Sequence, residues 1–195
     1  MGTTKGSEMI RTDPAAAYWH AVAMLRLDRP AGLAELEHVF ASGGSPSGMD
    51  GVHRGRLIAT TFGRGLDGPF ESAARAWMPW RGKTFDLGRS EGRNVFTPGG
   101  RRVLRVSFPG YAGTVREPDG GGLAFRFVTD AGPSETVPGL DVLRIDYRGL
   151  EDNPNWPIRR ILDELVEVAS GLYLGQALLL VRGRFRRAAW FSLEA

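Results

Sequence analysis

Hydrophobic and polar residues repeat with two different periods along the chain. From residue 14 to residue 28 apolar side chains recur at helical spacing, and Asp13-Pro14 supplies an N-cap acceptor followed by a proline suited to the first helical position. A second short apolar stripe, at residues 33–40, ends at Gly43-Gly44, where glycine can adopt the left-handed conformation. These patterns predict two helices before residue 45.

From Gly51 onward the period shortens to the two-residue alternation of β-strands, with glycine and proline between the segments. Such frequent turns favour an antiparallel sheet over βαβ units. In two of the expected strands, alternation leaves Arg105 and Arg126 opposite the apolar side chains, facing either solvent or a wet cavity. Strands are expected at residues 51–62, 80–85, 93–96, 103–108, 113–117, 123–129 and 142–147, with tight turns at 98–100 and 118–122 and a short helix at 69–77.

Residues 158–168 combine apolar side chains at helical spacing with oppositely charged residues four positions apart, Arg159 with Asp163 and Arg160 with Glu164. This pattern predicts a helix that starts from the Asn/Pro-rich loop at 153–157 and ends at Gly171. Its charged residues are expected on a solvated face.

The last segment predicts an apolar β-hairpin from about residue 172 to residue 193, with a two-residue turn at 183–184. This turn would place Ala177 opposite Trp190. Because both faces of the first strand are apolar, we expect it to be covered on both sides. Gln176, next to Phe191, is the polar residue of its face, so it either bonds to neighbouring groups or points at a ligand.

With 195 residues, of which 42% are hydrophobic, the chain can build one core. We therefore expect a flexible segment at 1–12 followed by a single domain over 13–195. The absence of cysteine excludes disulfides, thiolate nucleophiles and cysteine metal ligands.

The 25 basic residues nearly balance the 22 acidic ones, so the net charge of +3 does not predict a nucleic-acid partner. No apolar run is long enough to span a bilayer, and residues 1–9 lack the apolar stretch of a signal peptide. We expect no stable membrane insertion and a cytoplasmic location. The oligomeric state stays open.

Catalytic and cofactor motifs are missing from the sequence. His20, His38 and His53 show none of the spacings of a zinc site, and neither a GxSxG elbow nor a phosphate-binding glycine loop is present. We expect no metal, no cofactor and no catalytic residue set. Four acidic residues lie near the 153–157 loop, namely Asp141, Asp146, Glu151 and Asp152. Paired carboxylates can act in acid–base catalysis, but the carboxylates of polar loops are commonly exposed to solvent.

Four segments carry a resemblance to a known family: GVHRGRL at 51–57, WRGKTF at 80–85, YLGQAL at 173–178 and RAAWF at 187–191. They resemble the GxWxG-type opening and the closing hairpin of uncharacterised bacterial calycin-like (lipocalin-like) small β-barrel proteins. His53 stands where that pattern has tryptophan. The resemblance implies a barrel that holds a small apolar ligand. Some calycins bind haem, and His53 would be the available axial ligand.

The predicted fold class is α+β, with an antiparallel β-barrel or strongly curved sheet of about eight to ten strands, N-terminal helices, and one helix before the C-terminal hairpin. The leading functional hypothesis is non-enzymatic binding of a small hydrophobic or amphipathic molecule in the barrel cavity. The residues expected to contact this ligand are His53, Trp80, Arg105, Arg126, Gln176 and Phe191.

Two alternatives belong to other functional classes. The first is a cyclase, isomerase or lyase acting on an apolar substrate, with His53 or the region of Asp146 and Asp152 supplying acid–base groups within hydrogen-bond reach. The second is a protein-interaction module, which would show a large exposed apolar patch.

Overall fold

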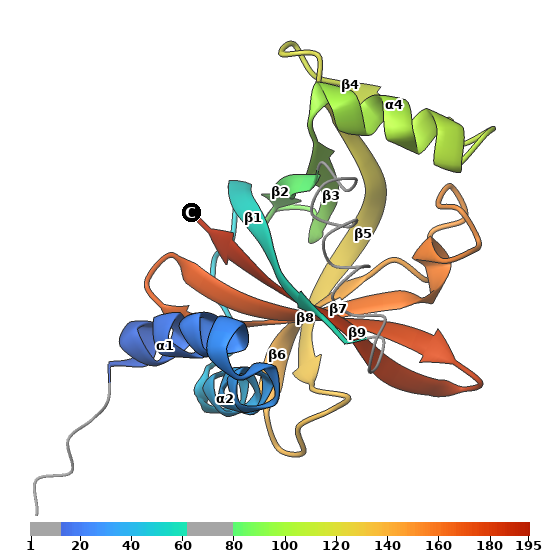
Figure 1. Cartoon of the computed structure of the whole chain (residues 1–195). Coiled ribbons are helices and arrows are strands. Elements are labelled where there is room, and N and C mark those ends of the chain that lie inside the picture. The colour runs from blue at the N-terminus through green and yellow to red at the C-terminus, as the bar shows by residue number, and fades with distance from the viewer. Residues whose placement is uncertain (1–12, 62–79) are drawn as a thin grey trace, which may run out of the picture.

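Residues 13–61 and 80–195 are described by the computed structural model (Figure 1). The flexible segment expected at 1–12 and the helix expected at 69–77 lie outside these residues. The strands described are β1 (Gly51–Thr60), β2 (Trp80–Asp86), β3 (Glu91–Phe96), β4 (Val115–Arg116), β5 (Gly122–Pro133), β6 (Asp141–Asp146), β7 (Ile161–Ala169), β8 (Leu172–Val181) and β9 (Arg184–Glu194). The helices described are α1 (Pro14–Leu27), α2 (Arg29–Ser42), α4 (Pro98–Ser107) and the short 3-10 helix η1 (Ile158–Arg160).

The strands form one nine-stranded antiparallel sheet that closes on itself. Closure comes from β3, which pairs with β2 on one side and with β5 on the other. Within the described residues this gives a ring of eight strands, and β4 stays outside the ring on the edge of β5. The closed barrel confirms the predicted α+β class and its antiparallel sheet.

Helix α1 starts at the predicted cap, Asp13, and α2 starts at Asp28, a cap that the sequence analysis did not assign. The Asp13 carboxylate accepts a hydrogen bond from the backbone N–H two residues later at 3.0 Å, and the Asp28 carboxylate accepts one from the N–H three residues later at 3.1 Å. A proline follows in the first turn of each helix. Among the described residues, no helix has both the length and the apolar character needed to cross a membrane.

The two helices lie against the outside of the barrel (Figure 1). Their buried side chains, such as Phe40, join a core cluster with the outward-facing side chains Val166 of β7, Leu174 of β8 and Trp190 of β9. Strand β8 is therefore covered on its outer face by helices and on its inner face by the barrel interior, which confirms the covering that its apolar pattern predicted.

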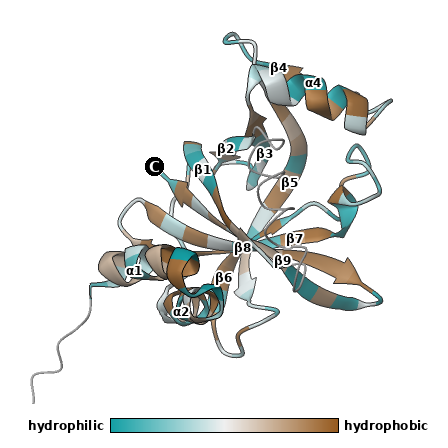
Figure 2. Cartoon of the chain, viewed as in Figure 1, coloured by the Kyte–Doolittle hydropathy of each residue, from teal (hydrophilic) through white to brown (hydrophobic). Residues whose placement is uncertain are grey.

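Helix α4 occupies the segment where alternation predicted a turn at 98–100 and a strand at 103–108, and both predictions were wrong. The hydroxyl of Thr97 accepts a hydrogen bond from the backbone N–H of Gly100 at 3.2 Å, so the proline and glycines begin a capped helix. Leu104 and Phe108 share a face in a strand and also in a helix, and this ambiguity misled the prediction. Hydrophilic and hydrophobic residues alternate around α4 (Figure 2). A helix does precede the C-terminal strands, at this earlier position.

The short 3-10 helix η1 and strand β7 replace the helix predicted at 158–168. Strand β7 pairs with β6 and β8, and both of its faces are apolar, with Leu165 turned into the barrel and Val166 turned toward the helices. A strand buried on both faces shows no alternation, so its apolar residues also matched a helical stripe. The predicted solvated face was wrong as well, because Asp163 and Glu164 are 4% and 0% exposed.

The C-terminal hairpin is present as β8 and β9, but its register differs from the prediction. The turn residues are Arg182 and Gly183, whose φ angles of 50° and 77° suit a two-residue hairpin turn. Ala177 therefore lies opposite Ala189 rather than opposite Trp190. Two small residues become direct neighbours across the two strands.

Candidate functional site

The barrel interior is packed at one end and hollow at the other. The packed end contains Phe85, Phe127, Ile145, Leu165, Tyr173 and Leu193. The hollow end is a cavity of about 390 Å³. Its apolar wall consists of Leu57, Trp80, Phe96, Val103, Leu104, Phe108, Phe125, Pro157, Ile158, Ile161, Ala177, Ala189 and Phe191. Helix α4 and the start of β7, the two elements that the sequence pattern misassigned, both contribute to this wall.

Two alanines help to keep the cavity open. Ala177 on β8 and Ala189 on β9 are paired across the hairpin, and both line the cavity. Protein interiors are close-packed, so larger side chains at these two positions would occupy the space. The register of the hairpin therefore determines where the barrel is hollow.

Two aromatic rings of the wall lie directly over glycines of the neighbouring strands. A Cβ atom on Gly55 would come within 2.4 Å of the Trp80 ring, and one on Gly175 within 2.3 Å of the Phe191 ring. The two rings also meet edge to face, with their centroids 5.7 Å apart. Glycine at these positions lets the rings lie flat against the barrel wall.

Polar side chains from four parts of the barrel meet where the cavity reaches the packed end: Lys83 on β2, Asn94 on β3, Tyr147 after β6, and Asp163 on β7. The ammonium of Lys83 donates hydrogen bonds to Asp163 Oδ2 at 2.8 Å, to Asn94 Oδ1 at 3.0 Å and to the Tyr147 hydroxyl. These three bonds use all of its donors. The Lys83 and Asp163 side chains are only 3% and 6% exposed, so they form a buried ion pair.

The remaining polar atoms of this cluster are almost all paired. Tyr147 donates its hydroxyl proton to Asp163 Oδ2 at 3.1 Å and accepts a hydrogen bond from Asn94 Nδ2 at 3.0 Å. Asn94 also donates to the carbonyl of Phe125 and accepts from the indole N–H of Trp80. Within the described residues the exception is Asp163 Oδ1, which is buried and has no hydrogen-bond partner. An unpaired buried acceptor is costly, so a donor on a ligand would be stabilised there.

Burial controls the ionisation of the cluster. Desolvation lowers the pKa of Lys83, and the charge and hydrogen bond of Asp163 act in the opposite direction. Desolvation raises the pKa of Tyr147 well above its usual value, and the charge of Asp163 raises it further. The Lys83 nitrogen lies 5.2 to 5.7 Å from the centroids of four aromatic rings, those of Trp80, Phe127, Tyr147 and Phe191.

Of the residues expected to bind a ligand, Trp80 and Phe191 line the cavity. His53 is buried at the packed end, where its ring meets Phe85 and Tyr173 edge to face at centroid distances of 5.4 and 5.6 Å. Desolvation lowers the pKa of His53. Since His53 is not part of the cavity wall, it does not present an axial ligand to a haem in that space.

The other three expected residues lie on the outside of the barrel. Arg105 is exposed on α4, and Arg126 lies 3.9 Å from the carboxylate of Asp152. Gln176 is buried under the outer layer, where its amide donates to Glu164 Oε2 at 2.7 Å and its carbonyl oxygen accepts from Arg187 Nε at 2.6 Å. The structure thus brings together Trp80 and Phe191 of the six expected residues.

The acid–base groups of the enzyme alternative do not meet. Asp146 forms a forked pair with Arg148, with its shortest contact at 2.6 Å, and Asp152 faces Arg126. No hydrogen bond or ion pair in residues 13–61 and 80–195 joins either carboxylate to His53. In the same residues, no three His, Asp or Glu side chains are grouped closely enough to hold a metal ion.

The sequence pattern did not predict the polar cluster, although the position of Lys83 in the sequence is unusual. Lys5 and Lys83 are the only lysines in a chain that otherwise uses arginine, and Lys83 alternates with Phe85 on the apolar face of an expected strand. A lysine on that face is a candidate for the interior. Asp163 gave no comparable signal, because its segment matched the charged side of a helix.

Comparison with known proteins finds no matching protein family and no matching curated sequence. A solved structure described as "Crystal structure of protein from Thermomonospora curvata" superposes on this chain with a TM-score of 0.49 and 16% identity. The alignment covers 92% of this chain and 97% of that chain. At this level the likeness says nothing about function. The closed barrel fits calycin-like barrels in general, and no GxWxG family is confirmed.

Proposed function

We propose that the barrel binds one small amphipathic molecule, whose apolar body lies in the cavity and whose polar head group meets the cluster of Lys83, Asn94, Tyr147 and Asp163. The observation that carries this proposal is the cavity itself, an apolar space of about 390 Å³ that ends on a buried polar cluster with one unpaired oxygen. Mostly apolar pockets with a few convergent polar groups are typical small-molecule sites.

The wall supports an aliphatic or cyclic apolar body of modest size. Small-molecule pockets commonly measure about 300 to 1,000 Å³, so this cavity lies near the lower limit and suits one short chain or one small ring system. Aromatic rings such as Trp80 and Phe191 provide large apolar contact area and lose little conformational entropy, because both are already held by the strand packing.

The cluster supports a head group that donates a hydrogen bond. The three donors of Lys83 are already used inside the cluster, and the free position is the acceptor Asp163 Oδ1. A hydroxyl or amine would pair with this oxygen, whereas a second carboxylate would meet an anion in a desolvated site. We therefore expect an alcohol to bind more tightly than the acid of the same length.

Isothermal titration calorimetry with 1-octanol and with octanoate tests the proposal. We expect saturable binding of 1-octanol to the wild-type protein and affinity at least about tenfold lower for octanoate. The Ala177→Phe variant, which fills the cavity, should lose 1-octanol binding. Ala131→Phe is the matched control, because Ala131 is exposed on β5.

Circular dichroism shows whether Ala177→Phe keeps the fold, and Ala189→Leu serves as a second cavity-filling variant. Unchanged 1-octanol binding in a folded cavity-filling variant would overturn the proposal. Tighter binding of octanoate than of 1-octanol would overturn the assignment of the head group.

A further inference from the structure

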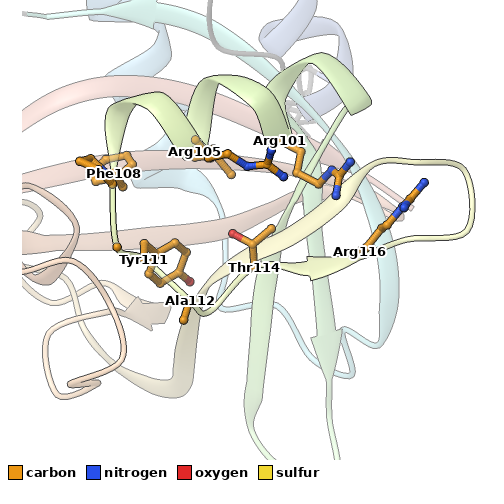
Figure 3. A pocket seen from close by; sticks show the side chains of 10 residues that line it. Arg101, Arg105, Phe108, Tyr111, Ala112, Thr114 and Arg116 are labelled. Atoms are coloured by element: carbon orange, nitrogen blue, oxygen red, sulfur yellow. The ribbon is translucent and has the colours of Figure 1, made fainter.

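A second depression lies on the outside of the barrel, between α4 and residues 109–116 (Figure 3). We call it the arginine groove. Its volume is about 440 Å³. Leu104 and Phe108 line both the groove and the barrel cavity, so α4 forms a partition between the two spaces. The groove and the cavity are separate spaces that share these two side chains as a common wall.

Three arginines line the groove from its two sides. Arg101 and Arg105 are one turn apart on α4, and Arg116 comes from β4 (Figure 3). Within residues 13–61 and 80–195, none of these three guanidinium groups forms an ion pair with a carboxylate. An exposed arginine outside the groove, Arg81, does form such a pair, with Asp119 at 2.6 Å. The groove therefore concentrates positive charge that no carboxylate of the described residues neutralises through an ion pair.

Arg101 is held in place by packing. A Cβ atom on Gly122 would lie 3.4 Å from the aliphatic stem of Arg101 and 3.3 Å from Thr114, so the stem and the threonine lie side by side on β5. The Nε atom of Arg101 is buried and has no hydrogen-bond partner. A guanidinium group whose stem is already fixed by packing loses little conformational entropy when it binds an acceptor.

The other end of the groove is aromatic and is also fixed. Phe108 and Tyr111 line it, and both rings pack on Phe125 with centroid distances of 5.2 Å. The hydroxyl of Tyr111 accepts a hydrogen bond from the backbone N–H of Phe125 at 2.7 Å. Arg93 donates to the carbonyl of Gly113 at 3.3 Å, which ties the loop to β3.

We propose that the arginine groove binds a small phosphate ester, with its phosphate among Arg101, Arg105 and Arg116 and a planar ring against Phe108 and Tyr111. Guanidinium groups match phosphate oxygens in paired, charge-assisted hydrogen bonds, and a phosphate monoester carries nearly two negative charges at pH 7. Aromatic side chains contribute stacking energy to a flat ring at the other end.

Calorimetric titration at low salt with adenosine 5′-monophosphate, inorganic phosphate and adenosine tests this site. We expect the monophosphate to bind most tightly, inorganic phosphate to bind more weakly, and adenosine not to bind. Arg105→Ala and Arg116→Ala should each weaken binding of the monophosphate about tenfold, as expected for loss of a charge-assisted bond. Arg102→Ala is the matched control, because Arg102 is exposed on the same helix and does not line the groove.

Both groove variants alter exposed side chains and should keep the wild-type unfolding midpoint. Ala177→Phe should leave binding of the monophosphate unchanged, because α4 separates the two spaces. The proposal is overturned if neither phosphate probe binds, if adenosine binds as tightly as its monophosphate, or if Arg102→Ala weakens binding as much as Arg105→Ala does. The last result would indicate general attraction to a basic surface.

Discussion

Lys83 on β2 donates a hydrogen bond to Asp163 on β7 at 2.8 Å, inside the closed barrel. The two residues are 80 positions apart in the sequence. Taking two charges out of water is costly, and their attraction offsets this cost only with good geometry and further hydrogen bonds, which Asn94 and Tyr147 provide here. The pair is therefore a sensitive point of the fold.

Removing one member of this pair should destabilise the protein more than removing both. Lys83→Met and Asp163→Leu each leave an uncompensated buried charge, and we expect each to lower the free energy of unfolding by about 3–5 kcal/mol. The double variant should lose less than either single variant. Urea denaturation of the four proteins gives this double-mutant cycle. Additive single effects would contradict a coupled pair.

The tyrosines should make the protein sensitive to alkali. The pKa of each is raised by burial in the folded state above the usual 10.0, for Tyr18, Tyr111, Tyr147 and Tyr173. The folded state therefore holds these protons after the unfolded state has lost them, so their contribution to stability is complete below pH 10 and is lost as pH rises further. Lys83, whose pKa is lowered from 10.5, has the opposite effect as pH rises toward 10.5.

Urea denaturation at several values between pH 9 and pH 11.5 measures this loss, and absorbance of tyrosinate near 295 nm follows the ionisation. Tyr147→Phe should show a smaller loss of stability over that range than the wild-type protein. Ionisation of all four tyrosines near pH 10 in the folded protein would show that the expectation is wrong.

Glu164 should stabilise the packing on the outside of the barrel. Its carboxylate is fully buried and accepts hydrogen bonds from the hydroxyl of Ser134, the backbone N–H of Glu135 and the amide of Gln176. We expect Glu164→Gln to lower the free energy of unfolding by about 2–3 kcal/mol. The substitution replaces one carboxylate oxygen, which accepts hydrogen bonds, with an NH₂ group that would face the donors of its neighbours. Hydrogen exchange should also become faster at residues 134–137.

Glu167→Gln is the matched control for that variant, since Glu167 lies on the same strand and its side chain is only half-buried. Both substitutions remove one negative charge. If they lower the free energy of unfolding equally, the hydrogen bonds of Glu164 do not contribute to stability.

Gly175→Ala should disturb the cavity wall. The new methyl group would lie 2.3 Å from the ring of Phe191, so the ring has to move and we expect a loss of about 1–3 kcal/mol in the free energy of unfolding. Gly149→Ala is the control, because a Cβ atom there meets no atom within 4 Å. Thermal unfolding of both variants distinguishes the two sites. An unchanged midpoint in Gly175→Ala would contradict this packing.

The sequence predicted those residues of the candidate site whose patterns involve only neighbouring positions in the chain. Trp80 and Phe191 were expected at the ligand because large aromatic residues in apolar strands commonly face an interior. The sequence pattern allows Gln176 to bind a ligand or to bond to neighbouring groups, and the structure gives it three polar neighbours on the outer face, Thr136, Glu164 and Arg187. Which face of β8 meets the interior depends on the curvature of the closed barrel, which no short segment encodes.

The sequence by itself determined the antiparallel class, the N-terminal helices and the apolar hairpin, because alternation, helix caps and turn residues act over a few positions. Only the tertiary structure decided that residues 161–169 form a strand and residues 98–107 a helix, since both segments fit either period. Pairing with β6 and β8 fixes the first of them as a strand. The tertiary structure also decided that Lys83 meets Asp163 and that Ala177 faces Ala189. Closure and register act between distant residues, and a shift of one residue changes what faces the cavity.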